Sequence, residues 1–174
     1  MASSALQFAL LTAARTTETI GTQRQEIDLI KGLWHVPAER MKARRPHTVP
    51  LSIQACNLLK RVMRSHNADC VFPGQKPGRY LSNMAMLTLT KKRLGSYDTT
   101  VHGLRSTFRT WAGEETNYNP GVIEFALAHQ LNRKVEGAYL RVSLVEPRRG
   151  LMQDWADFVD GSRPSENLER VVLN

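Results

Sequence analysis

The chain has 174 residues, 41% of them hydrophobic and 23% charged, which is an ordinary composition for one medium-sized globular domain. Lys and Arg number 24 against 16 Asp and Glu, and the net charge of +8 favours a polyanionic partner, with nucleic acid ahead of acidic lipid. With two cysteines, no basic secretory segment at the start and no apolar run near the ~18 residues that span a bilayer, we expect no disulfide framework, secretion signal or membrane span.

Apolar residues recur at helical spacing along most of the chain, and capping residues and helix breakers stand between these stretches. Two short apolar segments flank a basic connector at 39–46, which predicts an antiparallel hairpin with a long polar tip. The elements predicted in chain order are a buried helix over 5–14 with Ser3 or Ser4 as N-cap, strands over 32–38 and 48–51, a helix over 53–65 capped by Ser52, a strand end and turn over 71–74, a helix from Ser82 to about Leu94 ended by Gly95, a helix over 102–115, a short helix over 119–128 with Pro120 in its first turn, and helices over 133–140 and 147–159. The expected fold class is α+β, mostly α-helical, with one small antiparallel sheet.

Basic residues are concentrated between positions 40 and 64, where seven Lys and Arg occur without any Asp or Glu. Such a run is as consistent with a solvated face as with a surface that contacts nucleic acid. The seven residues are Arg40, Lys42, Arg44, Arg45, Lys60, Arg61 and Arg64.

Two pairs of side chains suit a phosphate. His102 and Arg105 are three residues apart, so a helix presents both on one face, where a guanidinium offers a bidentate fork and an imidazole a donor or a base. Arg15 follows an apolar helix and needs a partner, which Glu18 can provide. Each pair also has a plainer interpretation, a surface histidine with a salt-bridged arginine in the first case and a structural ion pair in the second.

His129, Tyr139 and Lys42 complete the candidate chemistry. The histidine and the tyrosine could each be packing residues. A tyrosine is a weak nucleophile at its ordinary pKa of about 10, but two arginines, a phosphate and a nearby base poise it for attack. Lys42 on the hairpin tip could protonate a leaving alkoxide, or simply contact a nucleic-acid backbone. The backbone-contact interpretation applies equally to Arg40, Arg44 and Arg45.

Taken in order, these residues resemble the catalytic domain of tyrosine recombinases, the phage integrase family, and especially prophage-type integrases that insert at tRNA genes. The resemblance covers most of residues 5–145 and implies a mostly helical core with a small three-stranded antiparallel sheet. The segments that carry it are Leu10–Glu18, Gly32–Lys42 with Arg44–Ser52, Val71–Pro73, His102–Ala112, and Leu127–His129 through Tyr139.

The resemblance assigns a role to each candidate. Arg15 and Arg105 would grip the non-bridging oxygens of the scissile phosphate. Tyr139 would attack phosphorus to form a 3′-phosphotyrosyl link, and Lys42 would protonate the departing 5′ oxygen. The remaining roles are acid/base partner of tyrosine and phosphate for His102, hydrogen bonding to the phosphate for His129, support of the first arginine for Glu18, and DNA-backbone contact for Arg40, Arg44 and Arg45. No cofactor, metal or ATP is expected, because side chains supply the cations and the covalent link conserves the phosphodiester energy.

The resemblance also implies partners and a domain organisation. The partner would be double-stranded DNA at an attachment core site, in the bacterial cytoplasm at the nucleoid, with accessory DNA-bending proteins. A homotetramer is expected in the synaptic complex, and a monomer is the alternative for this chain alone. Residues 1–161 would form the catalytic domain and 162–174 a flexible tail, with the N-terminal DNA-clamping domain of the family absent from this chain.

Three questions stay open at this level. The apolar stripe at Leu151, Met152, Trp155, Phe158 and Val159 fits packing within the chain, or donation of its helix to a neighbouring protomer. The same residue set also fits a type IB topoisomerase, which relaxes supercoils without pairing two sites. A non-catalytic DNA-binding remnant of an integrase is the third possibility.

Overall fold

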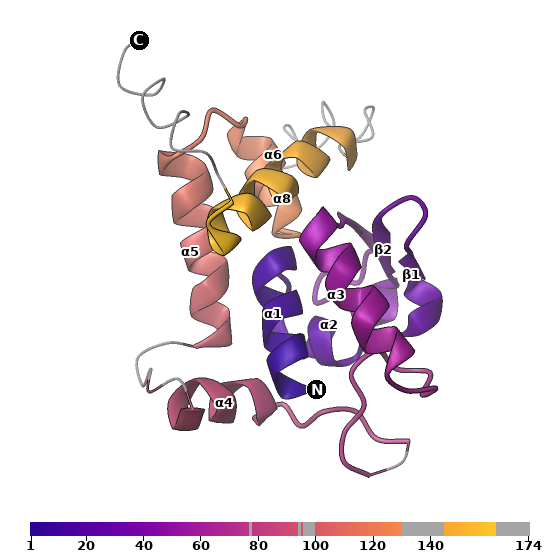
Figure 1. Ribbon diagram of the computed structural model, residues 1–174. Coiled ribbons are helices and arrows are strands. Elements are labelled where there is room, and N and C mark those ends of the chain that lie inside the picture. Colours follow the sequence, from indigo (N-terminus) through magenta and orange to yellow (C-terminus); the bar gives the residue numbers. More distant parts are fainter. Residues whose placement is uncertain (77, 94, 96–99, 130–144, 163–174) are drawn as a thin grey trace.

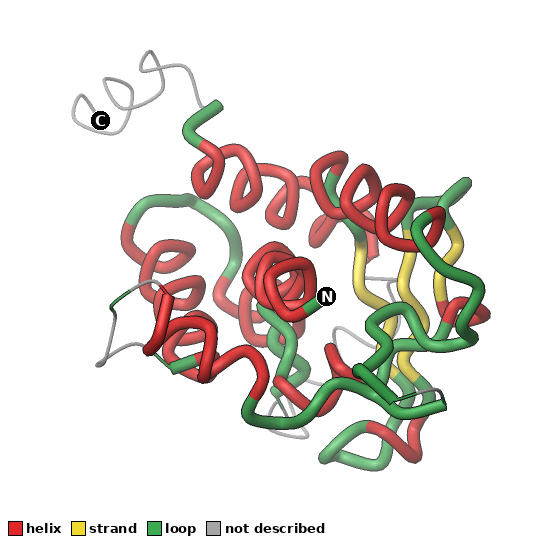
Figure 2. The backbone as a smooth tube through the Cα atoms, turned by 60° about the horizontal axis from the view of Figure 1, so that its bottom comes forward, coloured by secondary structure: helices red, strands yellow, loops and turns green. Residues whose placement is uncertain are grey.

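The first helix, α1 (Ala2–Thr12), runs through the middle of the molecule (Figures 1 and 2). The structure is a computed structural model that describes residues 1–76, 78–93, 95, 100–129 and 145–162. Ala5, Phe8 and Ala9 of α1 are buried because other elements pack around it. The helices that contact it are α2 (Thr16–Ile20), α3 (Ile53–Arg64), α4 (Ala85–Arg93), α5 (Val101–Glu114) and α8 (Val145–Asp160).

A three-stranded antiparallel sheet flanks this group of helices, in the order β1-β2-β3 (Figure 2). Its strands are β1 (Ile27–Asp28), β2 (Leu33–Val36) and β3 (His47–Pro50). Trp34 pairs with Ile27 on one side and Val49 on the other. Trp34 and Val36 are buried while His35 between them is exposed, as the two-residue period of a strand requires. The predicted hairpin and the three-stranded sheet are therefore confirmed.

Side-chain caps fix where helices begin. The Ser52 hydroxyl accepts the backbone N–H of Ala55 at 3.2 Å, and the Asn119 amide oxygen accepts the N–H of Gly121 at 2.8 Å at the start of α6 (Pro120–Ala126). Thr100, which the sequence did not single out, caps α5 through its hydroxyl. These local hydrogen bonds explain why helix starts are readable from sequence where a capping side chain is present.

Two predicted caps need correction. Helix α1 begins at Ala2, so Ser3 and Ser4 lie inside its first turn and neither caps it. The Ser82 hydroxyl accepts the N–H of Met84 at 3.2 Å, but this turn precedes α4, which begins at Ala85. In both cases a serine hydroxyl is available as a capping oxygen. The helix nevertheless starts where neighbouring residues with a higher helix propensity, such as Ala2 and Ala85, allow it.

The core consists of two clusters. One lies between α1, α3 and the sheet, with the Phe8 ring 5.0 Å from that of Trp34 and 5.5 Å from that of Phe72. The other lies between α5, α6 and α8, where the Phe108 and Trp155 ring centroids are 5.4 Å apart. Burying such large aromatic side chains supplies roughly 2 kcal/mol or more each.

The apolar stripe of α8 packs within its own chain. Leu151, Met152 and Trp155 are fully buried in the second cluster, and Phe158 stacks on the ring of Trp155 at 5.7 Å. The structure thus shows this stripe packed against the core of its own chain. No helix among the described residues is both long and apolar enough to cross a membrane.

Candidate active site

Arg15 and Glu18 form a rigid pair between α1 and α2. The Glu18 carboxylate is buried, and it accepts the backbone N–H of Arg15 at 2.9 Å and its Nη1–H at 2.7 Å. An acidic side chain in the first turn of α2 also faces the positive end of that helix. The predicted contact between these two residues is present, and it restricts the directions in which the Arg15 guanidinium can point.

Arg105 of α5 joins two separate segments of the chain. Its Nη1 donates to the Ala13 carbonyl, and its Nη2 donates to the Leu127 carbonyl at 2.7 Å. These acceptors stand two residues before Arg15 and two residues before His129. One buried guanidinium therefore fixes the backbone on which the other two predicted phosphate ligands are carried.

The two arginines also act on each other electrostatically. Burial and, to a smaller degree, the charge of Arg15 lower the pKa of Arg105 to about 10, while the charge of Glu18 opposes the change. Arg105 therefore stays charged at neutral pH, and the two guanidinium groups share one neighbourhood with the Glu18 carboxylate. An anion placed between them would relieve this repulsion, and a phosphate fits the fork of each guanidinium.

Two left-handed alanines shape this region. Ala13 at the end of α1 has φ 49° and Ala128 after α6 has φ 51°. Such a residue costs roughly 1 kcal/mol when it is not glycine, and it turns the chain away from the helix. Both turns lie beside the carbonyls that Arg105 holds, so the guanidinium satisfies acceptors that the helix ends leave without an intrahelical partner.

His129 lies at the outer end of a three-residue chain of polar contacts. Its Nδ1 is 2.6 Å from Glu124 Oε2, and Arg109 Nε donates to Glu124 Oε1 at 2.7 Å. Its backbone N–H also donates to the Glu124 carbonyl at 3.0 Å, in the hydrogen-bond pattern that closes a helix end. The sequence reasoning missed Glu124, although its position in the last turn before a candidate histidine was a usable signal.

His47 and Arg148 line the inner side of the same region and were also missed. A small cavity is lined by Glu18, His47 and Arg105 among others. Arg148 is buried, donates to the Thr48 carbonyl at 2.6 Å and lies 5.1 Å from the ring centre of Phe125. His47 lies in one of the segments that carry the resemblance, but nothing there marks it as a site residue, and the neighbours of both residues come from distant parts of the chain.

The His47 ring is held neutral. Burial, followed by the charges of Arg148, Arg105 and Arg15, lowers its pKa to about 3, while the Ala126 carbonyl acts in the opposite direction. Its Nε2 is buried and has no hydrogen-bond partner among the described residues. The basic cluster thus includes an imidazole that does not add to its positive charge.

This neutral histidine should make folding stability depend on pH. In the unfolded chain the His47 ring binds a proton with a pKa of 6.5, whereas in the folded chain its pKa is about 3. The free energy of unfolding therefore falls as the pH falls through 6.5. At pH 5 we expect a loss of roughly 2 kcal/mol relative to pH 7 from this group. Urea denaturation of His47→Gln should show a flatter pH dependence than the wild type, with His102→Gln, at an exposed position, as control. Equal slopes for wild type and His47→Gln would contradict this account.

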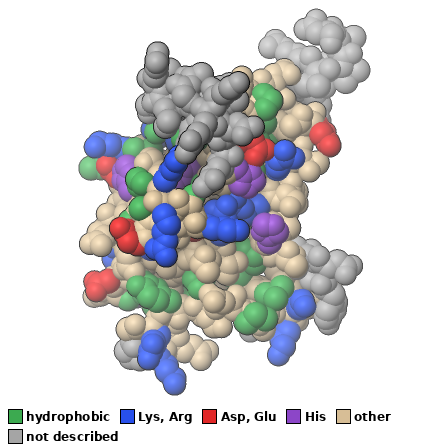
Figure 3. All heavy atoms as spheres, turned by 180° about the vertical axis from the view of Figure 1, so that it is seen from behind, with side chains coloured by type: hydrophobic (Ala, Val, Ile, Leu, Met, Phe, Trp, Pro, Cys, Tyr) green, Lys and Arg blue, Asp and Glu red, His purple; other side chains and the backbone are tan. Residues whose placement is uncertain are grey.

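The other predicted site residues differ in their surroundings. Lys42 and His102 are exposed, and neither side chain makes a hydrogen bond or ion pair with another residue in the described part of the chain. Arg44 and Arg45 are exposed on the hairpin tip that follows the short 3₁₀ helix η2 (Ala38–Arg40). Seen from behind, Lys, Arg and His side chains gather near the middle of one face (Figure 3). Tyr139 lies outside the described residues, as does the helix predicted over 133–140.

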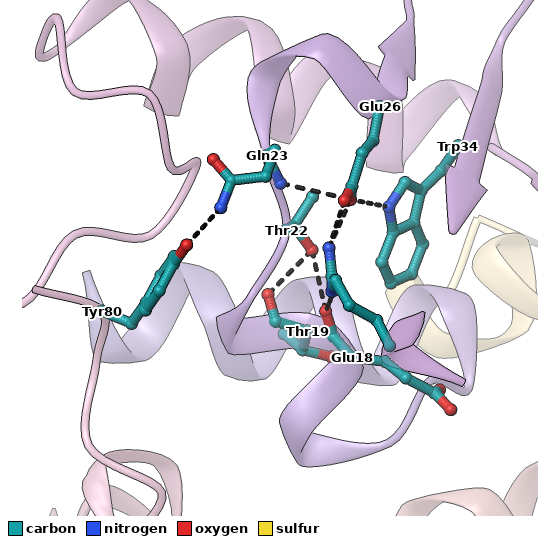
Figure 4. A network of polar contacts seen from close by, with 8 residues as sticks. Glu18, Thr19, Thr22, Gln23, Glu26, Trp34 and Tyr80 are labelled. Carbon is teal, nitrogen blue, oxygen red and sulfur yellow. Dashed lines mark hydrogen bonds and ion pairs between the residues drawn. The ribbon is translucent and has the colours of Figure 1, made fainter. Parts of the chain in front are cut away.

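Arg40 departs from the expectation of a DNA-backbone contact. Its guanidinium is ion-paired with the buried Glu26 carboxylate and also donates to the Glu18 carbonyl. The Trp34 indole N–H donates to the same Glu26 carboxylate at 3.0 Å (Figure 4). These partners occupy the guanidinium inside the protein, so Arg40 anchors the base of the hairpin tip two residues before Lys42.

Comparisons with known proteins identify the family of the chain. Residues 2–144 match the model of the phage integrase family. The chain is 39% identical over 158 residues to prophage integrase IntZ of Escherichia coli (strain K12), covering 90% of this chain and 39% of that protein. It is 40% identical over 170 residues to prophage integrase IntA of the same strain, covering 94% of this chain and 41% of that protein. This chain therefore spans about two-fifths of the length of these relatives.

The fold also resembles solved structures of the Tn1549 transposon integrase. In complex with circular intermediate DNA, that protein aligns with a TM-score of 0.55 at 17% identity, covering 86% of this chain and 56% of the other. A complex with transposon right end DNA gives a TM-score of 0.55 at 16% identity, covering 88% and 58%. At this identity the likeness concerns the fold, whereas the family match covers most of the sequence. The chain belongs to the phage integrase family.

Proposed function

We propose that this chain is the catalytic domain of a tyrosine-type site-specific DNA recombinase that acts in prophage integration or excision. The observation that carries the proposal is the Arg105 fork, which binds the two backbone segments that carry Arg15 and His129. This arrangement joins the backbone segments that carry these cationic and imidazole side chains, which come from three distant parts of the sequence. A phosphodiester is the ligand that such a set of donors fits.

The arginines would stabilise the reacting phosphate. As a nucleophile attacks phosphorus, negative charge grows on the equatorial oxygens, and donors fixed in advance lower the energy of that state. Arg15 is fixed by Glu18, and Arg105 by two carbonyls. His129 would add a third donor from the segment that Arg105 holds. Each such donor is worth on the order of 10²–10³ in rate.

Cleavage would be a transesterification. The Tyr139 phenolic oxygen forms a bond to phosphorus while the bond from phosphorus to the 5′ oxygen breaks. His102 takes the phenolic proton, and Lys42 gives a proton to the departing 5′ oxygen. Both side chains are exposed, so a bound DNA strand can reach them. Rejoining reverses these transfers, and it consumes no ATP because the phosphotyrosyl link keeps the phosphodiester energy.

The partner would be double-stranded DNA at an attachment core. The net charge of +8 favours such a polyanion, and the similar solved integrases are complexes with DNA. Arg44 and Arg45 on the hairpin tip are the exposed candidates for backbone contact. We extend the proposal to a catalytic domain over 1–161 with a tail over 162–174, and to a homotetramer with accessory DNA-bending proteins in the bacterial cytoplasm.

A nicked suicide duplex tests this function. Incubation with duplexes that carry candidate attachment cores should give a covalent protein–DNA adduct on a denaturing gel at one core and not at a scrambled duplex. Tyr139→Phe should abolish the adduct because the attacking oxygen is missing. An adduct without sequence preference would support a topoisomerase-like activity instead. Absence of any adduct, with the chain joined to the remaining portion found in its relatives, would support a non-catalytic remnant.

A further inference from the structure

The Arg109–Glu124–His129 contacts carry an inference that rests on the proposed function. We infer that Glu124 is a positioning residue that sets the ring orientation and the tautomer of His129, while Arg109 holds the carboxylate in place. The carboxylate binds the histidine through one oxygen at 2.6 Å and the arginine through the other at 2.7 Å. Both oxygens are thus engaged, and the carboxylate has little freedom to turn.

The contact decides which ring nitrogen faces a ligand. A carboxylate accepts hydrogen bonds and donates none, so the short contact requires a hydrogen on Nδ1. Nε2 then points away from Glu124 and is the nitrogen available to a phosphate. To donate to a phosphate oxygen, Nε2 must carry a hydrogen as well, which makes the ring an imidazolium.

The surroundings of the pair support this role. Among the described residues, the charged groups in contact with one another here are His129, Glu124 from α6 and Arg109 from α5, while Arg105 from α5 reaches the backbone at Leu127. Burial raises the pKa of the Glu124 carboxyl, but hydrogen bonds from His129 and Arg109 outweigh burial and lower it overall. Glu124 is therefore ionised at neutral pH. The side chains are only partly covered, with 24% of Glu124 and 40% of His129 exposed, so a ligand can approach the ring.

Tautomer measurements test the inference without DNA. Nitrogen-15 spectra of the histidine rings of the 174-residue chain report which ring nitrogen carries the hydrogen. In the neutral ring of His129, the wild type should show hydrogen on Nδ1. Glu124→Gln should shift the population to Nε2, the tautomer that free imidazole side chains favour. An unchanged tautomer would overturn the inference whether or not the chain cleaves DNA.

Cleavage kinetics provide the second test. With the suicide duplex, Glu124→Gln should lower the single-turnover rate about tenfold, as loss of an orienting partner commonly does. In a His129→Gln background the same change should have no further effect. Glu114→Gln, an equal charge change at an exposed site of α5, is the matched control.

The outcomes separate this inference from the proposed function. If the wild type forms no adduct with any duplex, the proposed function fails. The tautomer measurement still tests the inference about Glu124, because it does not depend on cleavage. If the wild type cleaves and Glu124→Gln matches Glu114→Gln in rate, the inference fails and the function survives. A Glu124→Gln effect of equal size in the His129→Gln background would show a purely structural role, and it would also overturn the inference.

Discussion

Arg105→Lys is expected to reduce strand cleavage by a factor on the order of 10²–10³ and to lower the free energy of unfolding by about 2 kcal/mol. Lysine keeps the positive charge but has a single ammonium, which cannot bridge two carbonyls as a guanidinium does. One of the Ala13 and Leu127 carbonyls would then be buried without its donor. The segments that carry Arg15 and His129 would lose their common anchor.

The two effects of Arg105→Lys can be measured separately. Urea denaturation gives the change in stability, and single-turnover cleavage of a suicide duplex gives the change in rate under conditions where the variant stays folded. Arg61→Lys, the same substitution at an exposed position of α3, is the control. If Arg105→Lys cleaves as fast as Arg61→Lys, then charge alone suffices at this position and the fork has no role in holding the site.

Local signals explain how much of the fold was predictable. The helices capped by Ser52 and Asn119 begin where the sequence indicated, because a cap is a contact within three residues. The hairpin was readable from two apolar segments and the basic connector between them. The prediction that Ser3 or Ser4 caps the first helix was wrong. A capping oxygen does not by itself fix the first residue of a helix when a preceding alanine can extend that helix toward the N-terminus.

Distant contacts explain what the sequence could not reveal about the site. Arg148 meets the Thr48 carbonyl across 100 residues, and Arg40 meets Glu26 across 14 residues. A basic run contains no information about which of its members is paired inside the protein, so Arg40 was counted with Arg44 and Arg45. The order of the candidate catalytic residues was recognisable by resemblance, whereas their supporting partners became visible only when the elements were placed together.

Glu26→Ala is expected to lower the free energy of unfolding by about 4 kcal/mol, which is a large share of the stability of a domain of this size. The substitution would leave the Arg40 guanidinium without its carboxylate. It would also orphan the indole N–H of Trp34, which is 0% exposed. Urea denaturation at neutral pH measures the change. The transition should become less cooperative, because the hairpin that carries Lys42 would unfold before the rest of the domain.

A second substitution decides whether the loss comes from the ion pair. Arg40→Met removes the buried charge, so Glu26→Ala with Arg40→Met should be less destabilised than the sum of the two single changes. Arg64→Met, at an exposed position of α3, is the control for removing an arginine and should change stability by less than about 0.5 kcal/mol. Additive losses in the double variant would mean that Glu26 and Arg40 act independently. Because Arg40 would then not depend on its internal carboxylate, it would return to the candidates for contact with the DNA backbone.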